Sequence, residues 1–141
     1  DKIHAFPIAI NDEEKISSLN LGSMKFGGSG NSFDRKITDS GLDFNPFYKQ
    51  GSVSFSLDFI SKKLNFFPEY VKIDVDGNEL KVINGMSVIL ESKNLKSICV
   101  ELNPEFKEHS EVFEILSNYF KNYKKYQWYD GQEVFNYIFK R

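Results

Sequence analysis

The stretch YVKIDVDGNEL, residues 70–80, joins a short apolar run to a cluster of acidic side chains. Apolar side chains alternate with other residues over 70–75, which predicts a β-strand. Residues 78–92 carry apolar side chains at helical spacing and predict a helix that Gly85 interrupts mildly. A strand followed directly by a helix is the repeating unit of α/β folds, so this stretch indicates the fold class.

The rest of the chain continues this alternation of strands and helices. Ser56 or Asp58 is expected to cap a short helix, Ser110 is expected to cap a longer one, and Asp130-Gly131 indicates a hairpin turn. The predicted strands are 3–10, 16–21, 52–57 and 97–103, the helices are 58–64 and 109–123, and the hairpin is 124–139.

These elements predict an α/β protein with a partial Rossmann-like sheet that is mostly parallel and ends in an antiparallel C-terminal hairpin. The run 97–103 is almost entirely apolar, so we expect this strand to be buried on both faces. Residues 1–141 are expected to form a single domain. Within it, 22–51 is rich in Gly, Ser, Asn and Asp and is expected to be a long, mobile loop.

Composition excludes several classes of protein and site. The chain has 18 basic and 20 acidic residues, a net charge of -2 and no basic stripe, which argues against a nucleic-acid partner. The mixed lysine and aromatic run 121–129 is therefore expected to be a solvated strand edge. Cys99 is the only cysteine, so we expect a structural thiol without disulfides. No run approaches the ~20 apolar residues of a membrane span, and the cytoplasm is the default location.

Polar side chains follow two of the predicted strands at the point where each strand ends. Asp74 follows one strand, and Glu101 and Asn103 close another. Ligands of open parallel sheets lie beyond these carboxyl ends, so neighbouring strands would bring the three residues into one crevice. That arrangement suits a general base or a pair of groups that orients a hydroxyl. Asp74 and Glu101 are therefore the candidate catalytic residues, and Asn103 is a candidate substrate ligand.

The turn 74–79 has alternative interpretations. An EF-hand loop requires Gly at position 6, whereas Gly77 is at position 4, so no calcium loop is predicted. Mg²⁺ held by Asp74 and a substrate oxygen stays open as an alternative. Asp76 is a candidate substrate ligand, but Asp76 and Glu79 could equally build the turn and the start of the helix.

Three further features have structural interpretations. GGSGNS, residues 27–32, lacks the third glycine of a phosphate-binding loop and is expected to be flexible. His4 and His109 have no nucleophile pattern near them and are expected to be surface or cap residues.

Several of these segments together resemble the FkbM family of S-adenosylmethionine-dependent methyltransferases. They are Ser56-Leu57-Asp58, the stretch 73–79, the Ile83-Asn84-Gly85 segment and Glu101, with Asp76 where Glu is commoner. The resemblance implies S-adenosylmethionine as cofactor and methyl transfer to a hydroxyl of a small-molecule or glycan acceptor, such as a sugar or polyketide. It also implies that Asp74 orients or deprotonates the acceptor with support from Glu101 and Asn103, and that Ala9 contacts the cofactor.

The resemblance further implies that the chain is the C-terminal part of the methyltransferase domain. The glycine-rich turn that binds the cofactor has no counterpart here and is expected ahead of residue 1. One sheet edge would then be exposed and could pair with another copy to form a homo-oligomer. The alternative is a non-catalytic α/β module that binds a partner or oligomerises.

Overall fold

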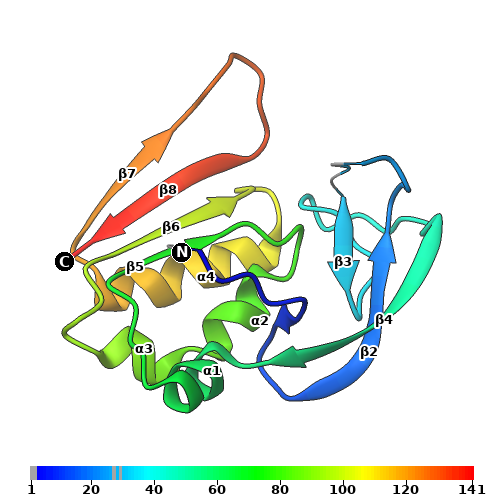
Figure 1. The fold of residues 1–141 in the computed structure, drawn as a ribbon. Coiled ribbons are helices and arrows are strands. Elements are labelled where there is room, and N and C mark those ends of the chain that lie inside the picture. Colours follow the sequence, from blue (N-terminus) through cyan, green and yellow to red (C-terminus); the bar gives the residue numbers. More distant parts are fainter. Residues whose placement is uncertain (1–2, 27, 29) are drawn as a thin grey trace.

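The computed structural model describes residues 3–26, 28 and 30–141, and it contains two four-stranded sheets that lie next to each other (Figure 1). The first sheet has the order β1-β4-β2-β3 and the second has the order β5-β6-β8-β7. Strands of the first sheet are β1 (Ala9–Ile10), β2 (Lys15–Leu21), β3 (Asn31–Phe33) and β4 (Tyr48–Phe55). Strands of the second sheet are β5 (Tyr70–Ile73), β6 (Ser97–Leu102), β7 (Asn122–Tyr126) and β8 (Phe135–Lys140). The helices are α1 (Leu57–Leu64), α2 (Glu79–Asn84), α3 (Ser87–Glu91) and α4 (Lys107–Tyr119).

The α/β class is confirmed, but the prediction of a mostly parallel sheet is wrong. Only β1 with β4 and β5 with β6 pair in parallel, whereas the pairs β2–β3, β2–β4, β6–β8 and β7–β8 are antiparallel. A helical crossover between neighbouring strands gives a parallel pair, and here α2 and α3 connect β5 to β6 in that way. Strand β8 instead follows β7 through a hairpin and therefore runs antiparallel to both of its neighbours, β6 and β7. That hairpin is confirmed, although its loop runs from 127 to 134 around Asp130-Gly131.

The segment 22–51 is more ordered than a plain loop. It contains β3 and the first residues of β4, and Ile37 forms an isolated bridge with Asp43. Gly27 and Ser29 of the GGSGNS motif lie outside the described residues. Strand 3–10 is shorter than predicted, because only its last two residues form β1.

Two of the predicted helix caps need correction. Ser56 caps α1 as predicted, because its hydroxyl accepts a hydrogen bond from the Phe59 amide at 3.2 Å. Asp58 instead caps α3, where its carboxylate accepts hydrogen bonds from the amides of Val88 and Ile89 at 2.9 and 3.0 Å. Ser110 does not cap α4, since that helix begins three residues earlier.

The predicted helix 78–92 is two short helices, α2 and α3, that meet at Gly85. A Cβ atom at this glycine would lie 2.2 Å from the carbonyl oxygen of Asn11. The chain leaving β1 therefore passes directly over the junction between the two helices.

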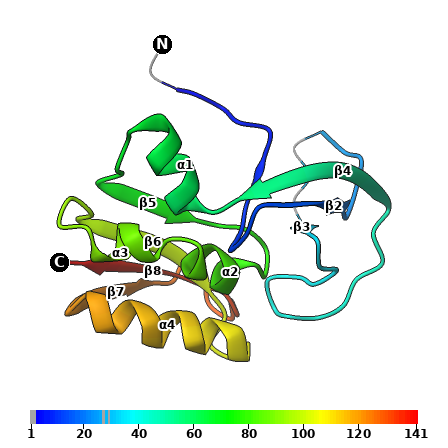
Figure 2. The same ribbon diagram turned by 90° about the horizontal axis from the view of Figure 1, so that it is seen from below.

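The hydrophobic core lies between the second sheet and helices α2, α3 and α4, which cover one of its faces (Figure 2). Ile98, Val100 and Leu102 of β6 point into this core, whereas Cys99 and Glu101 between them are only half-buried. The prediction that 97–103 is buried on both faces is therefore wrong. The other face of this second sheet, opposite the core, is open and carries the polar side chains of β6.

Polar contacts connect the first sheet to the rest of the molecule. Among the described residues, the buried core cluster includes none from β1 to β4, although the half-buried Ile10 of β1 packs against it. Asn78 donates hydrogen bonds to the hydroxyl of Ser32 at 2.9 Å and to the carbonyl of Phe33 at 3.2 Å. Arg35 and Glu108 form a bidentate ion pair at 2.6 and 2.7 Å, which joins the end of β3 to the first turn of α4.

In the part of the chain that the structure describes, no helix combines the length and the apolar character required to cross a bilayer.

Replacing Gly77 with Ala should destabilise the protein strongly. Gly77 has a φ of 87°, and a Cβ atom there would lie 2.4 Å from the carbonyl oxygen of Thr38. We expect a loss of at least about 2 kcal/mol in the free energy of unfolding, measured by urea denaturation. Gly131 is the matched control, because its φ is 81° but no atom lies within 4 Å of the added Cβ. Gly131→Ala should cost only about 1 kcal/mol, and equal losses would contradict the close approach at Gly77.

The Arg35–Glu108 pair should make stability depend on acid. The hydrogen bond from Arg35 lowers the pKa of Glu108 below its ordinary value of 4.5. The stabilising contribution of this lowered pKa is thus complete above about pH 4.5 and is lost as the pH falls through the folded-state pKa. Glu108→Gln should cost about 1 kcal/mol at pH 7. Urea denaturation between pH 7 and 3 should show a shallower loss of stability in this variant than in the wild type; parallel curves would rule the pair out.

Candidate functional site

The structure brings Asp74 and Glu101 together at the carboxyl ends of two parallel strands. Ile73 of β5 is directly opposite Val100 of β6, and each is followed by one of the two acidic residues. Burial raises the pKa of Glu101, and the negative charge of Asp74 raises it further. The predicted neighbourhood of these two candidate catalytic residues is therefore observed, while their catalytic role stays a prediction.

Glu101 is half-buried on the open face of the sheet and is held in place from β8. The amide of Asn136 donates a hydrogen bond to the Glu101 carboxylate at 3.2 Å. The carbonyl oxygen of the same amide lies 3.6 Å from the Cys99 thiol, which donates to it. Burial raises the pKa of Cys99 above its ordinary value, which keeps the thiol protonated and supports a structural role.

Asp74 is the accessible member of the pair. Its side chain is 47% exposed and forms an ion pair with Lys72, two residues earlier on the same face. The hydrogen bond to Asp74 raises the pKa of Lys72, so this ammonium stays charged beside the carboxylate. An exposed carboxylate next to a half-buried one, at the end of a sheet, can accept a proton from a bound hydroxyl.

Asp76 holds the loop before β3. Its Oδ2 atom accepts hydrogen bonds from the amides of Gly30 and Asn31 at 3.1 and 3.2 Å. Desolvation raises the pKa of Asp76, and these two hydrogen bonds oppose the shift. These contacts give the residue a structural task in the turn, as one of the two interpretations of the sequence predicted. Its role as a substrate ligand stays a prediction.

Asn103 follows Glu101 by two residues in the sequence, but its exposed fraction is only 3%. Its side-chain oxygen accepts a hydrogen bond from the Glu105 amide at 2.9 Å and closes the turn after β6. The backbone N–H of Asn103 donates a hydrogen bond to Nδ1 of His109 at 2.7 Å. The residue shapes the strand end, and direct contact with a substrate stays a prediction.

His109 and Glu79 form a buried pair that the sequence did not reveal. Both side chains are at most 2% exposed, and Nε2 of His109 lies 2.8 Å from Oε2 of Glu79. Because Nδ1 accepts a hydrogen bond from the Asn103 amide, the proton of a neutral imidazole lies on Nε2, which donates to the carboxylate. The prediction that His109 is a surface or cap residue is therefore wrong. No spacing rule links residues 30 apart, so only the fold could show this pair. His4 is exposed, as predicted.

Ala9 lies in the first sheet, opposite Ser54, and not in the sheet that carries Asp74. Its role as a cofactor contact stays a prediction. Among the described residues, no group of three or more His, Cys, Asp or Glu side chains could hold a metal ion. The alternative of Mg²⁺ at Asp74 with a substrate oxygen would show itself as loss of activity on chelation.

A cavity of about 520 Å³ opens next to Glu101. Asp39, Trp128, Tyr129 and Gln132 are among the residues that line it. The aromatic run 121–129 was predicted to be a solvated edge, and β7 is indeed exposed throughout. The sequence did not indicate that two of its aromatic residues would border the acidic site.

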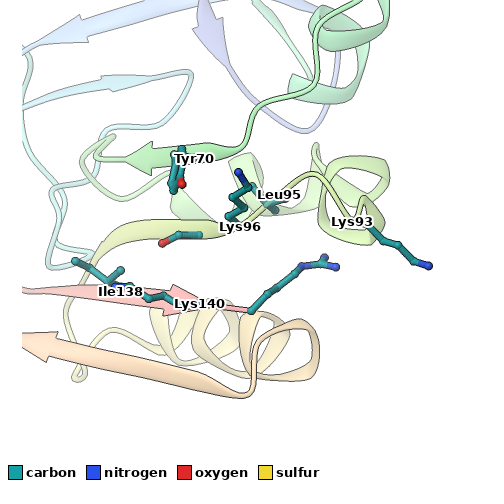
Figure 3. A pocket seen from close by; sticks show the side chains of 8 residues that line it. Tyr70, Lys93, Leu95, Lys96, Ile138 and Lys140 are labelled. Carbon is teal, nitrogen blue, oxygen red and sulfur yellow. The ribbon is translucent and has the colours of Figure 1, made fainter.

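A second cavity, of about 590 Å³, lies at the opposite end of the same sheet, between Tyr70, Lys96 and Lys140 (Figure 3). Lys93 and Arg141 also line it, and Lys96 is paired with Glu69 at 2.7 Å. The two ends of the sheet therefore carry opposite charge. Asp74 and Glu101 make one end acidic, and these lysines make the other end basic.

Comparison with known protein families identifies the chain. The sequence model of the methyltransferase FkbM domain matches residues 3–126. The chain belongs to this family. Searches of curated proteins and of solved structures gave no match. Membership of the FkbM family confirms the resemblance seen in the sequence and favours a methyltransferase over a non-catalytic α/β module.

Breaking the buried Glu79–His109 pair in this FkbM domain should cost stability. Glu79→Leu leaves the Nε2 hydrogen of His109 without an acceptor, and we expect a loss of about 2 kcal/mol in the free energy of unfolding. Glu79→Gln keeps an oxygen acceptor and should cost less than half as much. Urea denaturation at pH 7 measures both values, and indistinguishable losses would contradict a hydrogen bond between the two side chains.

Proposed function

We propose that this FkbM-family protein transfers a methyl group from S-adenosylmethionine to a hydroxyl oxygen of a sugar, polyketide or glycan-type acceptor. The observation that carries the proposal is the Asp74–Glu101 pair on the open face of the second sheet. The pair combines an accessible carboxylate with a half-buried one whose pKa is raised. Such a combination suits proton transfer from a hydroxyl group.

The fold part of the proposal is that the second sheet is part of a Rossmann-like methyltransferase sheet. The parallel pair of β5 and β6, joined by α2 and α3 on one face, supports it. In open α/β sheets ligands lie beyond the carboxyl ends of the strands, which is where Asp74 and Glu101 lie.

The charge of this end of the sheet suits the proposed cofactor. S-Adenosylmethionine supplies a methyl group on a positively charged sulfur. Burial raises the pKa of Asp76, and the negative charges of Asp39 and Asp74 raise it further, so the three carboxylates lie in one acidic environment. An acidic environment favours a cation such as a sulfonium. Asp74 would therefore lie near the charged part of the cofactor, and Ala9 belongs to the same proposal as a contact from β1.

In the proposed mechanism Asp74 receives the proton of the acceptor hydroxyl. The oxygen–methyl bond would form as the sulfur–methyl bond of the bound cofactor breaks. The products would be a neutral ether on the acceptor, a neutral thioether as the leaving group and a protonated carboxyl on Asp74. Glu101 keeps its own proton to a higher pH than an exposed glutamate because burial raises its pKa. As the half-buried neighbour of Asp74, Glu101 supports the site by accepting a hydrogen bond from a second hydroxyl of the acceptor. Asn103 and Asp76 support this site from the two adjoining turns, as ligands of the acceptor in the same proposal.

Two further expectations belong to the proposal. The single cysteine needs no oxidising compartment, which agrees with a cytoplasmic location. Strand β5 is at the edge of the second sheet, so a homo-oligomer could form by pairing at this edge.

Asp74→Asn should reduce the rate of methyl transfer by about 100-fold, because the amide cannot accept the proton. The measurement is transfer of a labelled methyl group from S-adenosylmethionine to a panel of hydroxyl compounds. Glu69→Gln is the matched control, since Glu69 is also an exposed carboxylate paired with a lysine, at the far end of the sheet. This control should keep full activity.

Calorimetry with S-adenosylmethionine separates loss of binding from loss of chemistry in the Asp74→Asn protein. We expect cofactor affinity to change by less than about tenfold, because the acidic neighbours of Asp74 remain. Activity retained in Asp74→Asn would remove Asp74 from the mechanism. Failure of the natural full-length protein to bind S-adenosylmethionine would overturn the assignment of the cofactor.

A further inference from the structure

Two large aromatic side chains stand exposed in the loop between β7 and β8. Trp128 is 74% exposed and Tyr129 is 68% exposed. Both lie beyond residues 3–126, which the family match covers, so the loop is a feature of this chain outside the matched residues. Adjacent exposed aromatic rings beside a cavity are typical of a surface that binds a ligand.

The loop is held in one conformation by its own hydrogen bonds. Gln132 is 9% exposed, and its Oε1 atom accepts hydrogen bonds from the amides of Trp128 and Tyr129 at 2.5 and 3.1 Å. The amide nitrogen of Gln132 donates to the carbonyl of Val134, and that of Gln127 donates to the carbonyl of Tyr129 at 3.0 Å. These hydrogen bonds restrain the backbone beneath the two rings, and a restrained backbone lowers the entropic cost of binding.

The lining of the adjoining cavity combines this aromatic surface with hydrogen-bonding groups. The cavity of about 520 Å³ is lined by Trp128 and Tyr129 and by the polar residues Asp39, Ser40, Glu101 and Glu133, among others. Its volume is within the range of small-molecule sites. Three acidic residues of the lining, Asp39, Glu101 and Glu133, make the cavity unfavourable for phosphate-bearing or other anionic ligands, because like charges repel.

We infer that this cavity binds the acceptor and that the acceptor is a neutral pyranose sugar. The weakly polarised C–H groups on one face of a pyranose are attracted to the negative face of an aromatic ring, which Trp128 and Tyr129 offer. The hydroxyl groups at the rim of the sugar donate hydrogen bonds to Asp39 and Glu101. A polyketide would bury large apolar surface against these carboxylates without enough donors to satisfy them, so the lining favours the sugar.

The position of Glu101 connects this binding surface to the chemistry. Glu101 lines the cavity and is also the partner of Asp74 at the strand ends. A sugar stacked on the two rings would therefore present a rim hydroxyl to the acidic pair. The role of the sugar as methyl acceptor rests on the proposed function, but binding of the sugar can be measured without methyl transfer.

Intrinsic fluorescence provides a specific measurement, because Trp128 is the only tryptophan of the chain. The probes are methyl glycosides of neutral hexoses and 6-deoxyhexoses, titrated into the protein without cofactor. We expect saturable changes in fluorescence, and Tyr129→Ala should weaken the affinity by about tenfold. Tyr70→Ala is the matched control, since Tyr70 is also 68% exposed but borders the basic cavity at the other end of the sheet. It should leave the affinity unchanged.

Saturation-transfer NMR with the same glycosides extends the test to Trp128→Ala and Trp128→Phe, which lack the fluorescent group. We expect Trp128→Ala to abolish the saturation signal and Trp128→Phe to keep part of it. Absence of glycoside binding to the wild type, or equal weakening by Tyr129→Ala and Tyr70→Ala, would overturn the inference. Methylation of a non-sugar hydroxyl in the absence of glycoside binding would refute the sugar site alone. Binding that depends on Trp128 without any methyl transfer would support the sugar site and refute the proposed function.

Discussion

The turn 76–79 between β5 and α2 is the constraint on which the rest of the structure depends. Asp76 binds the amides before β3, Gly77 allows the backbone to approach Thr38, Asn78 binds the end of β3, and Glu79 accepts a hydrogen bond from a buried histidine of α4. Four consecutive residues thus connect the first sheet, the second sheet and the last helix. The first sheet contributes little to the core, where the half-buried Ile10 of β1 packs against the cluster of the described residues, so these polar contacts supplement apolar packing at this junction. Buried hydrogen bonds of this kind stabilise little each, but leaving them unmade is costly.

The acidic residues in and next to this turn differ in their surroundings, although they are close in sequence. Oδ2 of Asp76 accepts hydrogen bonds from two amides, and Glu79 accepts one from an imidazole, so both residues hold parts of the fold together. Asp74 lies just before the turn, points to the open face and forms an ion pair with Lys72. Glu101 meets it from the neighbouring strand. A rigid turn directly behind an accessible carboxylate is a suitable support for a catalytic group, because the position of that group is then fixed by the backbone.

Sequence periodicity predicted most of the elements in the part of the chain that forms the core. The strand at 70–75, the α1 cap at Ser56 and the C-terminal hairpin all depend on neighbours within a few residues, where local rules apply. The direction of the strands was predicted less well, because an apolar run does not show whether its partner enters through a helix or a hairpin. The run 97–103 was predicted to be buried on both faces because its half-exposed residues include a cysteine, which resembles a core residue in a sequence.

The sequence by itself determined the family, the α/β class and the two acidic residues at the strand ends, since these follow from short motifs and from the alternation of strands and helices. Only the tertiary structure decided which carboxylates remain accessible to a ligand. The burial of His109 against Glu79, the commitment of Asp76 to the loop before β3 and the position of Trp128 beside Glu101 all join residues at least 27 positions apart. Contacts over such distances arise when packing closes the chain on itself, and no local pattern encodes them.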